Sequence, residues 1–223
     1  MIDLISIHIA KTGGRSFYEI LKNQYAEVLD KRYKRVHYFP DNNYQNKLIY
    51  RIPNNVKVIH GHLLFEHIEE IYRKYNSKII TWFRDPVERV ISNYYFLMLK
   101  VREDNNHPHY KKRNYTLLEY ANESIRNKMS GYLNGIELEE LFFFGFLEDF
   151  NTGLKILSSK LEWKKPIEKT HINKSKTNVL LHDVSTKEET ITEDMKNIIR
   201  ELNQDDVALY EKAKILYKKK FCA

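Results

Sequence analysis

The segment KTGG, residues 11–14, stands between a short apolar run and a stretch with helical periodicity. Backbone N–H groups in the first turn of a helix have no partner within that helix, and together with the helix dipole they bind anions. The pattern differs from the common nucleotide loop G-x-x-x-x-G-K-[ST], because Lys11 precedes both glycines. The sequence therefore predicts either a phosphate-binding loop of another kind or a plain strand-to-helix turn with a surface lysine.

A second polar cluster, RDPVERVIS, begins at Arg84 and follows the apolar run 78–83. Ser92 lies eight residues after Arg84, about two turns along a helix that Asp85 and Pro86 are suited to start. This spacing allows a guanidinium and a hydroxyl to surround one further phosphate. The second cluster therefore favours the phosphate-loop interpretation of KTGG.

Two histidines, His60 and His62, follow another apolar run at 56–59. Side-chain direction repeats every second residue in a strand, so both are expected on the same face. A histidine is suited to remove a proton from an attacking hydroxyl near neutral pH, and two structural histidines at a strand end are the alternative. No carboxylate or cysteine cluster accompanies the pair, so a metal site is not predicted.

Each of these polar clusters follows a predicted strand. Short apolar runs indicate strands at 4–9, 56–59, 78–83 and 142–146, and helical periodicity indicates helices after the KTGG segment and at 66–75, 86–99, 149–157, 193–202 and 206–217. Strands that alternate with helices predict an α/β fold with a parallel sheet covered on both faces, whose ligands bind at the carboxyl ends of the strands. No internal repeat indicates a second domain, so residues 1–223 are expected to form one.

Other segments carry weaker signals. Ser16 is a possible cap for the helix that follows KTGG. The polar stretch 100–116 is expected to be a long surface loop, and its basic run 111–113 is either an anion-recognition site or an ordinary solvated surface. The aromatic runs 94–96 and 142–144 are expected in the core.

The overall composition favours anionic partners. The chain has 223 residues, 42% of them hydrophobic, and a formal net charge of +7. Nucleic acid, polyanionic sugar and phosphate-bearing cofactors all suit such a surface. The single cysteine, Cys222, excludes an intrachain disulfide and favours a reducing compartment. We expect a cytoplasmic protein without a membrane span, because no signal-like or membrane-spanning segment is evident.

HIAKTGGRSF resembles the 5′-phosphosulfate loop, and RDPVERVISNYYF resembles the 3′-phosphate motif, of sulfotransferases that use 3′-phosphoadenosine 5′-phosphosulfate (PAPS). The segments HGHLLF, FFGFLEDFNTGLKIL, THINKSK and LYEKAKILYKKKF are similar to segments of that family in the same order. The resemblance is nearest to carbohydrate sulfotransferases of the heparan sulfate 2-O and 6-O type and their bacterial counterparts. Arg15 replaces the small hydroxyl residue of many relatives, and the region 100–135 matches no family segment that identifies the acceptor.

The resemblance implies a three-layer, P-loop-like fold and transfer of the sulfuryl group from PAPS, with 3′-phosphoadenosine 5′-phosphate (PAP) as product. The acceptor is then a hydroxyl of a carbohydrate or other molecule, with anionic polysaccharides among the candidates. The resemblance further implies that Lys11 stabilises the leaving oxygen, that His62 is the base and that His60 supports or replaces it. No metal is required, because Lys and Arg supply the positive charge. The residues placed around the nucleotide are Lys11, Thr12, Gly13, Gly14, Arg15, Ser16, Phe17, Arg84, Ser92, Lys174 and Ser175.

Two other functions fit parts of the sequence. A nucleoside or small-molecule kinase would use the KTGG loop for ATP and needs a magnesium carboxylate after a strand, for which Asp85 is the candidate. A nucleic-acid-binding module would use the positive charge, but the sequence has no recognised motif of that kind, and its aromatic residues are not interleaved with Lys and Arg. Nucleic acid is therefore not an expected partner.

Overall fold

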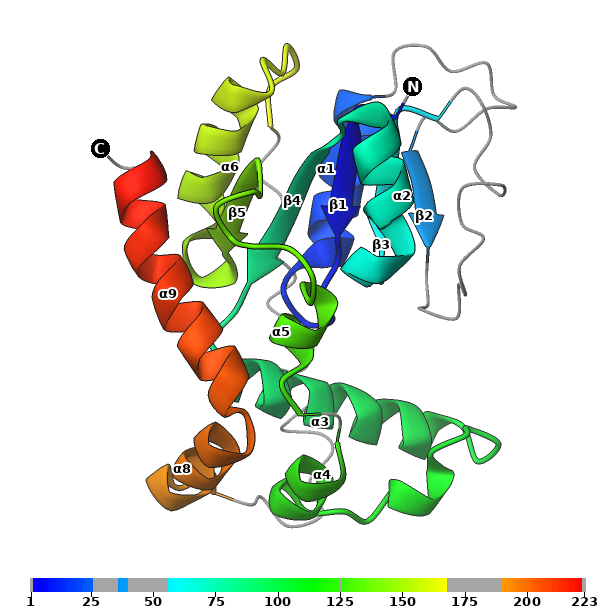
Figure 1. Ribbon diagram of the computed structural model, residues 1–223. Coiled ribbons are helices and arrows are strands. Elements are labelled where there is room, and N and C mark those ends of the chain that lie inside the picture. Colours follow the sequence, from blue (N-terminus) through cyan, green and yellow to red (C-terminus); the bar gives the residue numbers. More distant parts are fainter. Residues whose placement is uncertain (1, 26–35, 40–55, 125, 168–189, 222–223) are drawn as a thin grey trace.

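Five parallel strands form one sheet in the described part of the chain (Figure 1). The structure is a computed structural model and describes residues 2–25, 36–39, 56–124, 126–167 and 190–221. The strand order across the sheet is β2-β3-β1-β4-β5. The bounds are β1 Leu4–Ile7, β2 Val36–Phe39, β3 Val58–Gly61, β4 Lys78–Phe83 and β5 Phe143–Phe146.

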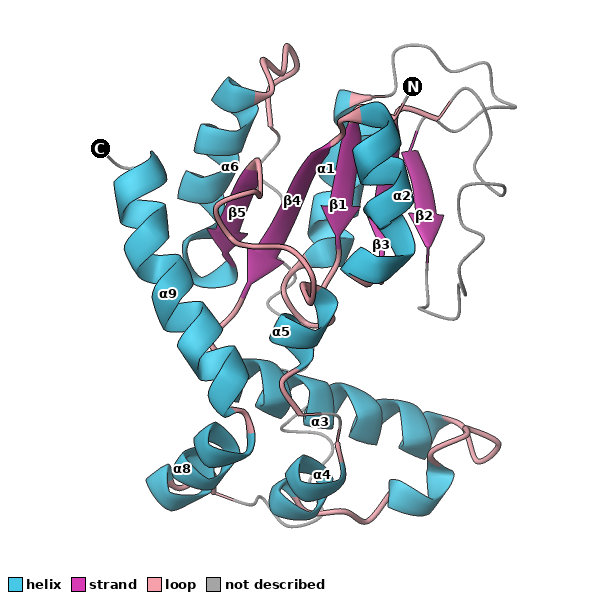
Figure 2. Cartoon of the chain, in the orientation of Figure 1, coloured by secondary structure: helices cyan, strands magenta, loops and turns pink. Residues whose placement is uncertain are grey.

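Helices cover both faces of this sheet (Figure 2). Every residue of β1, β3 and β5 is buried, as is typical of parallel strands with helices on each side. The predicted α/β fold with a helix-flanked parallel sheet is confirmed. The helices are α1 Gly14–Gln24, α2 Phe65–Tyr75, α3 Pro86–Glu103, α4 Leu117–Glu123, α5 Lys128–Tyr132, α6 Phe150–Lys160, α8 Glu193–Leu202 and α9 Gln204–Phe221, with short 3-10 helices η3 Tyr110–Lys112 and η4 Leu147–Asp149.

The central strand β1 brings three chain segments to one edge of the sheet. It pairs with β3 on one side and β4 on the other, and Ile7 lies opposite Gly61 and Thr81. Because all three strands run in the same direction, the residues that follow them leave the sheet at the same edge. These are the segments that contain the KTGG loop, the two histidines and Arg84.

The start of α3 follows the sequence prediction. Asp85 is the N-cap residue, and its side chain accepts a hydrogen bond from the N–H of Glu88 at 3.0 Å. Pro86 occupies the first helical turn. The end differs, because the helix continues past the predicted residue 99 to Glu103. Val101 is fully buried and extends the apolar face of the helix into the stretch expected to be a loop.

The start of α1 differs from the prediction. Gly13 is the N-cap residue and has a left-handed backbone with φ of 88°, whereas Ser16 lies inside the first turn. The predicted Ser16 cap is therefore wrong. The left-handed turn at Gly13, which glycine adopts without a steric penalty, starts the helix earlier than a side-chain cap at Ser16 would.

The helices α3, α4 and α8 pack together beyond the carboxyl ends of the strands (Figure 2). Their buried apolar side chains form a second hydrophobic cluster separate from the core around the sheet. Its members are Val87, Val90, Ile91, Leu117, Tyr120, Ala121, Met195 and Ile199.

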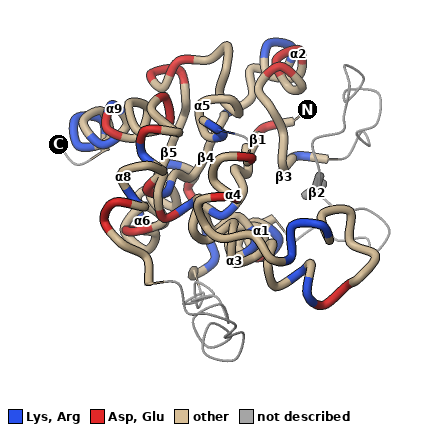
Figure 3. The backbone as a smooth tube through the Cα atoms, turned by 90° about the horizontal axis from the view of Figure 1, so that it is seen from below, with Lys and Arg blue, Asp and Glu red and all other residues tan. Residues whose placement is uncertain are grey.

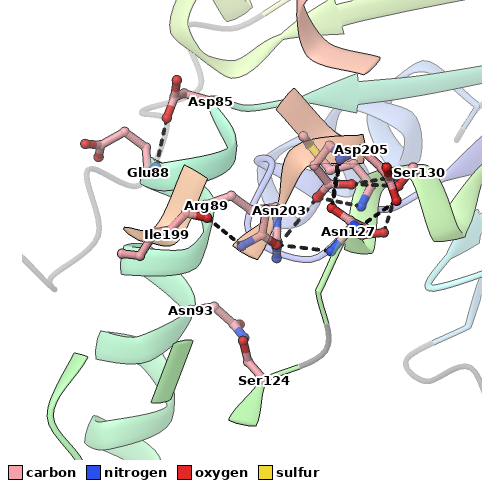
Figure 4. Close-up of polar contacts among 12 residues, drawn as sticks. Asp85, Glu88, Arg89, Asn93, Ser124, Asn127, Ser130, Ile199, Asn203 and Asp205 are labelled. Carbon is pink, nitrogen blue, oxygen red and sulfur yellow. Dashed lines mark hydrogen bonds and ion pairs between the residues drawn. The ribbon is translucent and has the colours of Figure 1, made fainter. Parts of the chain in front are cut away.

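Polar contacts, some buried and some exposed, join the start of α9 to α3 and to α5. Arg89 of α3 lies 3.8 Å from Asp206 of α9, and both side chains are almost fully buried. Asp206 also accepts hydrogen bonds from the N–H groups of Met129 and Ser130 at 3.0 and 2.8 Å. Figure 4 shows neighbouring contacts between α5 and the start of α9, including the 2.7 Å hydrogen bond from Asn127 to Asp205. The first turns of α5 and α9 are thus fixed to each other.

Charged residues of both signs are interspersed when the molecule is viewed from the carboxyl ends of the strands (Figure 3). The last turn of α9 is basic and carries Lys218, Lys219 and Lys220. In the described part of the chain, no helix combines the length and apolar character that crossing a bilayer requires.

Candidate active site

The loop after β1 leads directly into the N-terminus of α1. Lys11 has a left-handed backbone with φ of 72°, and Gly13 follows with φ of 88°. The Thr12 hydroxyl donates a hydrogen bond to the Ile9 carbonyl oxygen at 2.8 Å, which ties the loop to the end of the strand. No described side chain caps α1. The N–H groups of its first turn are therefore suited to an anion.

Burial divides the side chains of this loop into two groups. Thr12 and Ser16 are buried, and Phe17 is fully buried in the core, where its ring contacts Trp82. The Phe17 N–H already donates to the Gly13 carbonyl oxygen at 3.1 Å, so both polar and apolar parts of Phe17 are engaged inside the protein. Arg15 is exposed and Lys11 is half-buried, which leaves these two cations to face a ligand.

Three cations from two segments converge beside this loop. The Lys11 Nζ lies 4.2 Å from the centroid of the Phe96 ring, and the Arg15 guanidinium carbon lies 5.9 Å from the same centroid. Arg84, which follows β4, donates from Nη1 to the Lys11 carbonyl oxygen at 3.4 Å. The fold therefore brings together Lys11 and Arg84, which the sequence assigned to two separate phosphate sites.

The electrostatics of Lys11 reflect this crowding. Burial, followed by the charges of Arg84 and Arg15, lowers the pKa of Lys11 from 10.5 to about 8. No described carboxylate forms an ion pair with Lys11 or Arg15. A bound anion would favour the charged amine and relieve the repulsion among the three cations. A cluster of cations that includes a lysine with a lowered pKa, at the carboxyl edge of a parallel sheet, is a candidate functional site.

Ser92 lies on the face of α3 that is turned toward the loop. Glu88, Ser92 and Phe96 are spaced four residues apart and therefore share one face of the helix. Glu88 lies 3.7 Å from the Arg84 guanidinium, and Phe96 lies beneath Lys11. Ser92 is placed between these two contacts and is partly exposed. The structure thus brings Ser92 to the side of α3 where Arg84 lies.

His62 is held in one defined orientation next to the loop. Its Nδ1 lies 2.7 Å from the His8 carbonyl oxygen. A carbonyl oxygen only accepts, so Nδ1 must carry the proton and the lone pair of the neutral ring is on Nε2. Tyr132 of α5 contributes a second, longer contact, because its hydroxyl oxygen lies 3.4 Å from the same Nδ1. His62 is partly exposed.

His60 has a different environment. Its ring is 1% exposed, and its Nδ1 lies 2.8 Å from the Ser6 hydroxyl oxygen, the residue opposite it in the strand register. Burial, with a smaller contribution from His62, lowers the pKa of His60 to about 3, so the ring is neutral at physiological pH. A residue closed off in this way supports its neighbours, and direct contact with an acceptor is left to His62.

A third histidine, His8, completes the group, and sequence reasoning missed it. The His8 ring stacks on His62 at 4.2 Å and on His60 at 5.1 Å between ring centroids. Burial, then the charges of His60 and His62, hold the pKa of His8 well below 6.5. In the parallel register of β1 and β3, Ser6 lies opposite His60, so His8, two residues further, lies beside His62. The sequence could have identified His8 only if β1 and β3 had been known to be neighbouring strands.

The comparisons with known proteins concern the fold. No protein-family profile matches the chain, and no curated protein matches it in sequence. Solved structures do resemble it, among them the following two. One is mouse sulfotransferase SULT7A1 complexed with PAP, with 15% identity and a TM-score of 0.48 over 82% of this chain and 64% of that chain. The other is a sulfotransferase from Alicyclobacillus acidocaldarius, with 13% identity and a TM-score of 0.41 over 95% of this chain and 99% of that chain.

This chain therefore aligns with less than two thirds of the length of the mouse sulfotransferase. At such identities and TM-scores the likeness adds nothing to an argument about chemistry.

Other predicted residues lie elsewhere or outside the described ranges. Lys174 and Ser175 belong to residues 168–189, which lie outside the described part of the chain. In the basic run 111–113, Lys112 pairs with Glu123 at 3.0 Å, and the Arg113 guanidinium packs on the Tyr110 ring. Two of these three basic side chains thus contact neighbours within their own region.

The aromatic runs 94–96 and 142–144 contain both core residues and residues of the candidate site. Phe143 and Phe144 are fully buried, as expected of core residues. Phe96 is only partly buried and supports the cations of the candidate site. Its assignment to the core was therefore wrong, because an aromatic ring on this face of α3 meets the KTGG loop rather than apolar side chains.

The arrangement combines an anion-binding loop with a base. Lys11, Arg15 and Arg84 supply positive charge around the N-terminus of α1. His62 lies next to His8, directly after the neighbouring strand β3, and the contact of its Nδ1 with the His8 carbonyl oxygen makes Nε2 the unprotonated nitrogen of the neutral ring. Cations that stabilise charge on a leaving oxygen and a base that takes a proton from a hydroxyl are the two groups that a metal-free group transfer requires.

Proposed function

We propose that this protein is a PAPS-dependent sulfotransferase that transfers the sulfuryl group to a hydroxyl of a carbohydrate acceptor. The single observation that carries this proposal is the convergence of Lys11, Arg15 and Arg84 beside one helix N-terminus, without a described carboxylate paired to Lys11 or Arg15. This arrangement suits a ligand with more than one anionic group. The resemblance of both flanking motifs to the 5′-phosphosulfate and 3′-phosphate motifs supports PAPS as that ligand.

The loop after β1 would hold the 5′ end of the donor. Backbone N–H groups of residues 12–16 at the α1 N-terminus and the side chains of Lys11 and Arg15 supply the contacts. The Thr12 hydroxyl proton is donated to Ile9, so Thr12 shapes the loop and offers its oxygen lone pairs only. This division of roles follows from the burial of Thr12 and the exposure of Arg15.

The 3′-phosphate would bind between Arg84 and Ser92. The Arg84 guanidinium is 22% exposed and is held by the Lys11 carbonyl oxygen and Glu88, which limits its freedom before the donor binds. A guanidinium binds phosphate through two parallel hydrogen bonds, and the Ser92 hydroxyl adds a third. Lys174 and Ser175 complete the set proposed from the sequence.

The reaction exchanges one sulfur–oxygen bond for another. The donor supplies an activated sulfuryl group, and the bond from sulfur to the acceptor oxygen forms as the bond to the 5′-phosphate oxygen breaks. The acceptor proton passes to Nε2 of His62, while the proton on Nδ1 stays there and remains hydrogen-bonded to the His8 carbonyl oxygen. Lys11 stabilises the negative charge that grows on the leaving phosphate oxygen, and this role requires the protonated amine.

The environment of Asp85 disfavours the kinase alternative. Its side chain accepts the Glu88 N–H and caps α3, and its backbone N–H donates to the Glu148 carboxylate at 2.8 Å. Asp85 therefore has a structural role at the start of α3, and a magnesium ligand at this position would share its carboxylate with the helix cap.

The carbohydrate nature of the acceptor is inferred from the resemblance to the 2-O and 6-O sulfotransferases, and the net charge of +7 favours an anionic polysaccharide. Two experiments test the proposal. Thermal shift with PAP is compared with thermal shift by ATP plus magnesium, and transfer of labelled sulfate from PAPS is screened over neutral and anionic polysaccharides. We expect stabilisation by PAP and labelled product. Preferential stabilisation by ATP plus magnesium, without labelled product, would remove the proposal.

A further inference from the structure

The ring of His8 is enclosed between the anion loop and His62. It stacks on the His62 ring with 4.2 Å between centroids and an interplanar angle of 25°. On the loop side it lies against Gly14, the first residue of α1, where an added Cβ would stand only 1.9 Å from the His8 ring. The ring therefore fills the whole space between the backbone of the loop and the imidazole of His62.

The backbone of His8 is hydrogen-bonded to the segment that contains His62. Its carbonyl oxygen accepts the Nδ1 proton of His62 at 2.7 Å, and its N–H donates to the Gly61 carbonyl oxygen at 2.7 Å. One residue thus contacts His62 through both its ring and its carbonyl group. Rotation of the His62 ring would break the hydrogen bond and the stacking contact together.

The His8 ring is not held by a hydrogen bond of its own Nδ1. That nitrogen is buried and has no hydrogen-bond partner among the described residues. The ring therefore contributes no hydrogen bond to the described residues through Nδ1, and its contacts with Gly14 and His62 are made by packing and stacking. Burial, then His60 and His62, and to a smaller extent Arg15 and Lys11 lower the pKa of His8, so the neutral ring adds no charge to the anion site.

We propose that His8 is a positioning residue that fixes the orientation of the base His62 and its spacing from the phosphate loop at Gly14. This inference rests on the proposed sulfotransferase function. His8 is not expected to touch the donor or the acceptor, because it is only 7% exposed and its ring lies between Gly14 and His62. It acts on the reaction by keeping Nε2 of His62 aimed at the acceptor.

Three variants separate the properties of the ring. His8→Ala removes the ring, His8→Asn keeps a polar atom without an aromatic face, and His8→Phe keeps an aromatic face without nitrogen. We expect kcat to fall by about 10²-fold in His8→Ala and His8→Asn, because small misplacements of a reacting group have effects of this size. His8→Phe should lose much less. PAP affinity should stay close to that of the wild type in all three, since the cations are untouched.

Nuclear magnetic resonance of the ligand-free protein tests the orientation directly. With ¹⁵N-labelled histidine, we expect one tautomer of His62, protonated at Nδ1, in the wild type and in His8→Phe. His8→Ala should give a mixture of tautomers, because the ring can then turn away from the carbonyl oxygen. Thermal unfolding of each variant confirms that the protein measured is folded.

A second pair of variants tests the contact with the loop. Gly14→Ala places a Cβ into the His8 ring, so it should lower the Tm strongly in the wild type and much less in the His8→Ala background, where space has opened. Equal effects in both backgrounds would show that the ring does not support the loop and would overturn the inference.

Two further results would overturn the positioning role of His8, and a third would reject the proposed function instead. A folded His8→Ala protein with wild-type kcat and a single His62 tautomer would overturn the positioning role. So would His8→Phe with a kcat as low as that of His8→Ala, because the ring nitrogens and not the stacking face would then be required. Failure of the wild type to bind PAP or transfer sulfate would instead reject the proposed function, and the tautomer measurement does not depend on that result.

Discussion

Arg84 Nη1 donates a hydrogen bond to the carbonyl oxygen of Lys11 at 3.4 Å, although 73 positions separate the two residues in the chain. The contact exists because β1 and β4 are adjacent parallel strands that end at the same edge of the sheet. A single ligand that binds at this edge therefore meets both residues. The proposed donor has two phosphate groups at opposite ends of its ribose, which matches a site with two neighbouring sources of positive charge.

The first prediction concerns Arg84. Arg84→Ala should weaken PAP binding by about 1.5–3 kcal/mol, the typical contribution of a hydrogen bond to a charged group. Glu88→Gln is the matched control, because Glu88 lies 3.7 Å from the same guanidinium and competes with a phosphate for it. We expect equal or tighter PAP binding in Glu88→Gln. Titration calorimetry measures both, and unchanged affinity in Arg84→Ala would refute the assignment.

The second prediction concerns the base. His62→Ala should lower kcat by about 10²- to 10⁴-fold, because the attacking hydroxyl loses its proton acceptor, while PAP affinity is largely kept. His109→Ala provides a control in an exposed histidine of the segment after α3 and should keep wild-type turnover. The rate of labelled sulfate transfer at saturating donor gives kcat for each. A His62→Ala enzyme with normal turnover would assign the proton transfer to another group.

The third prediction is a pH dependence of donor binding. In the free protein the pKa of Lys11 is about 8. Below pH 8 the amine is charged with or without the donor, so this residue leaves the affinity unchanged. Above pH 8 the free protein loses the proton that the anionic donor favours, so PAP affinity should fall by up to about tenfold per pH unit.

Lys11→Arg removes this titration, because a guanidinium stays charged throughout the range. The PAP dissociation constant is measured from pH 7 to pH 10 for both proteins. We expect a decline for the wild type and a flat profile for Lys11→Arg. Parallel profiles for the two proteins would show that Lys11 does not titrate at the donor site.

The fourth prediction concerns stability. Asp206 is fully buried beside the buried Arg89, and burial lowers the pKa of that guanidinium, although Asp206 opposes the effect. Asp206→Asn leaves Arg89 as an uncompensated buried charge and should reduce the free energy of unfolding by about 3–5 kcal/mol. The exposed neighbour Asp205 is the control, and Asp205→Asn should change it by less than about 0.5 kcal/mol. Urea denaturation distinguishes the two, and equal losses would contradict a role for the buried pair.

The fold could be predicted from the sequence where apolar runs end in turn residues. The predicted strand at 78–83 and the predicted helix at 193–202 agree with β4 and α8 to the residue. The strand β2 was missed although the sequence directly after it, PDN at residues 40–42, consists of residue types that favour turns. The helix α4 was missed although its capping box, Thr116 with Glu119, was visible in the sequence. The signal lay at the end of a stretch interpreted as a loop.

The candidate site could be predicted in part for the same reason. Lys11, Arg84 and His62 each follow a predicted strand, and parallel strands bring such residues to one edge. His8 and Phe96 could not be identified, because their roles depend on strand register and on which face of α3 meets the loop. Such information comes from tertiary packing and has no local sequence signal.

The central claim is that one doubly phosphorylated adenosine binds to both the KTGG loop and Arg84. Titration calorimetry of PAP against 5′-AMP tests it most directly, because the two ligands differ only in the 3′-phosphate. We predict that the wild type binds PAP about 10- to 100-fold more tightly than 5′-AMP and that Arg84→Ala loses this preference. Equal affinities of the wild type for the two nucleotides, or a preference that survives in Arg84→Ala, would contradict the claim.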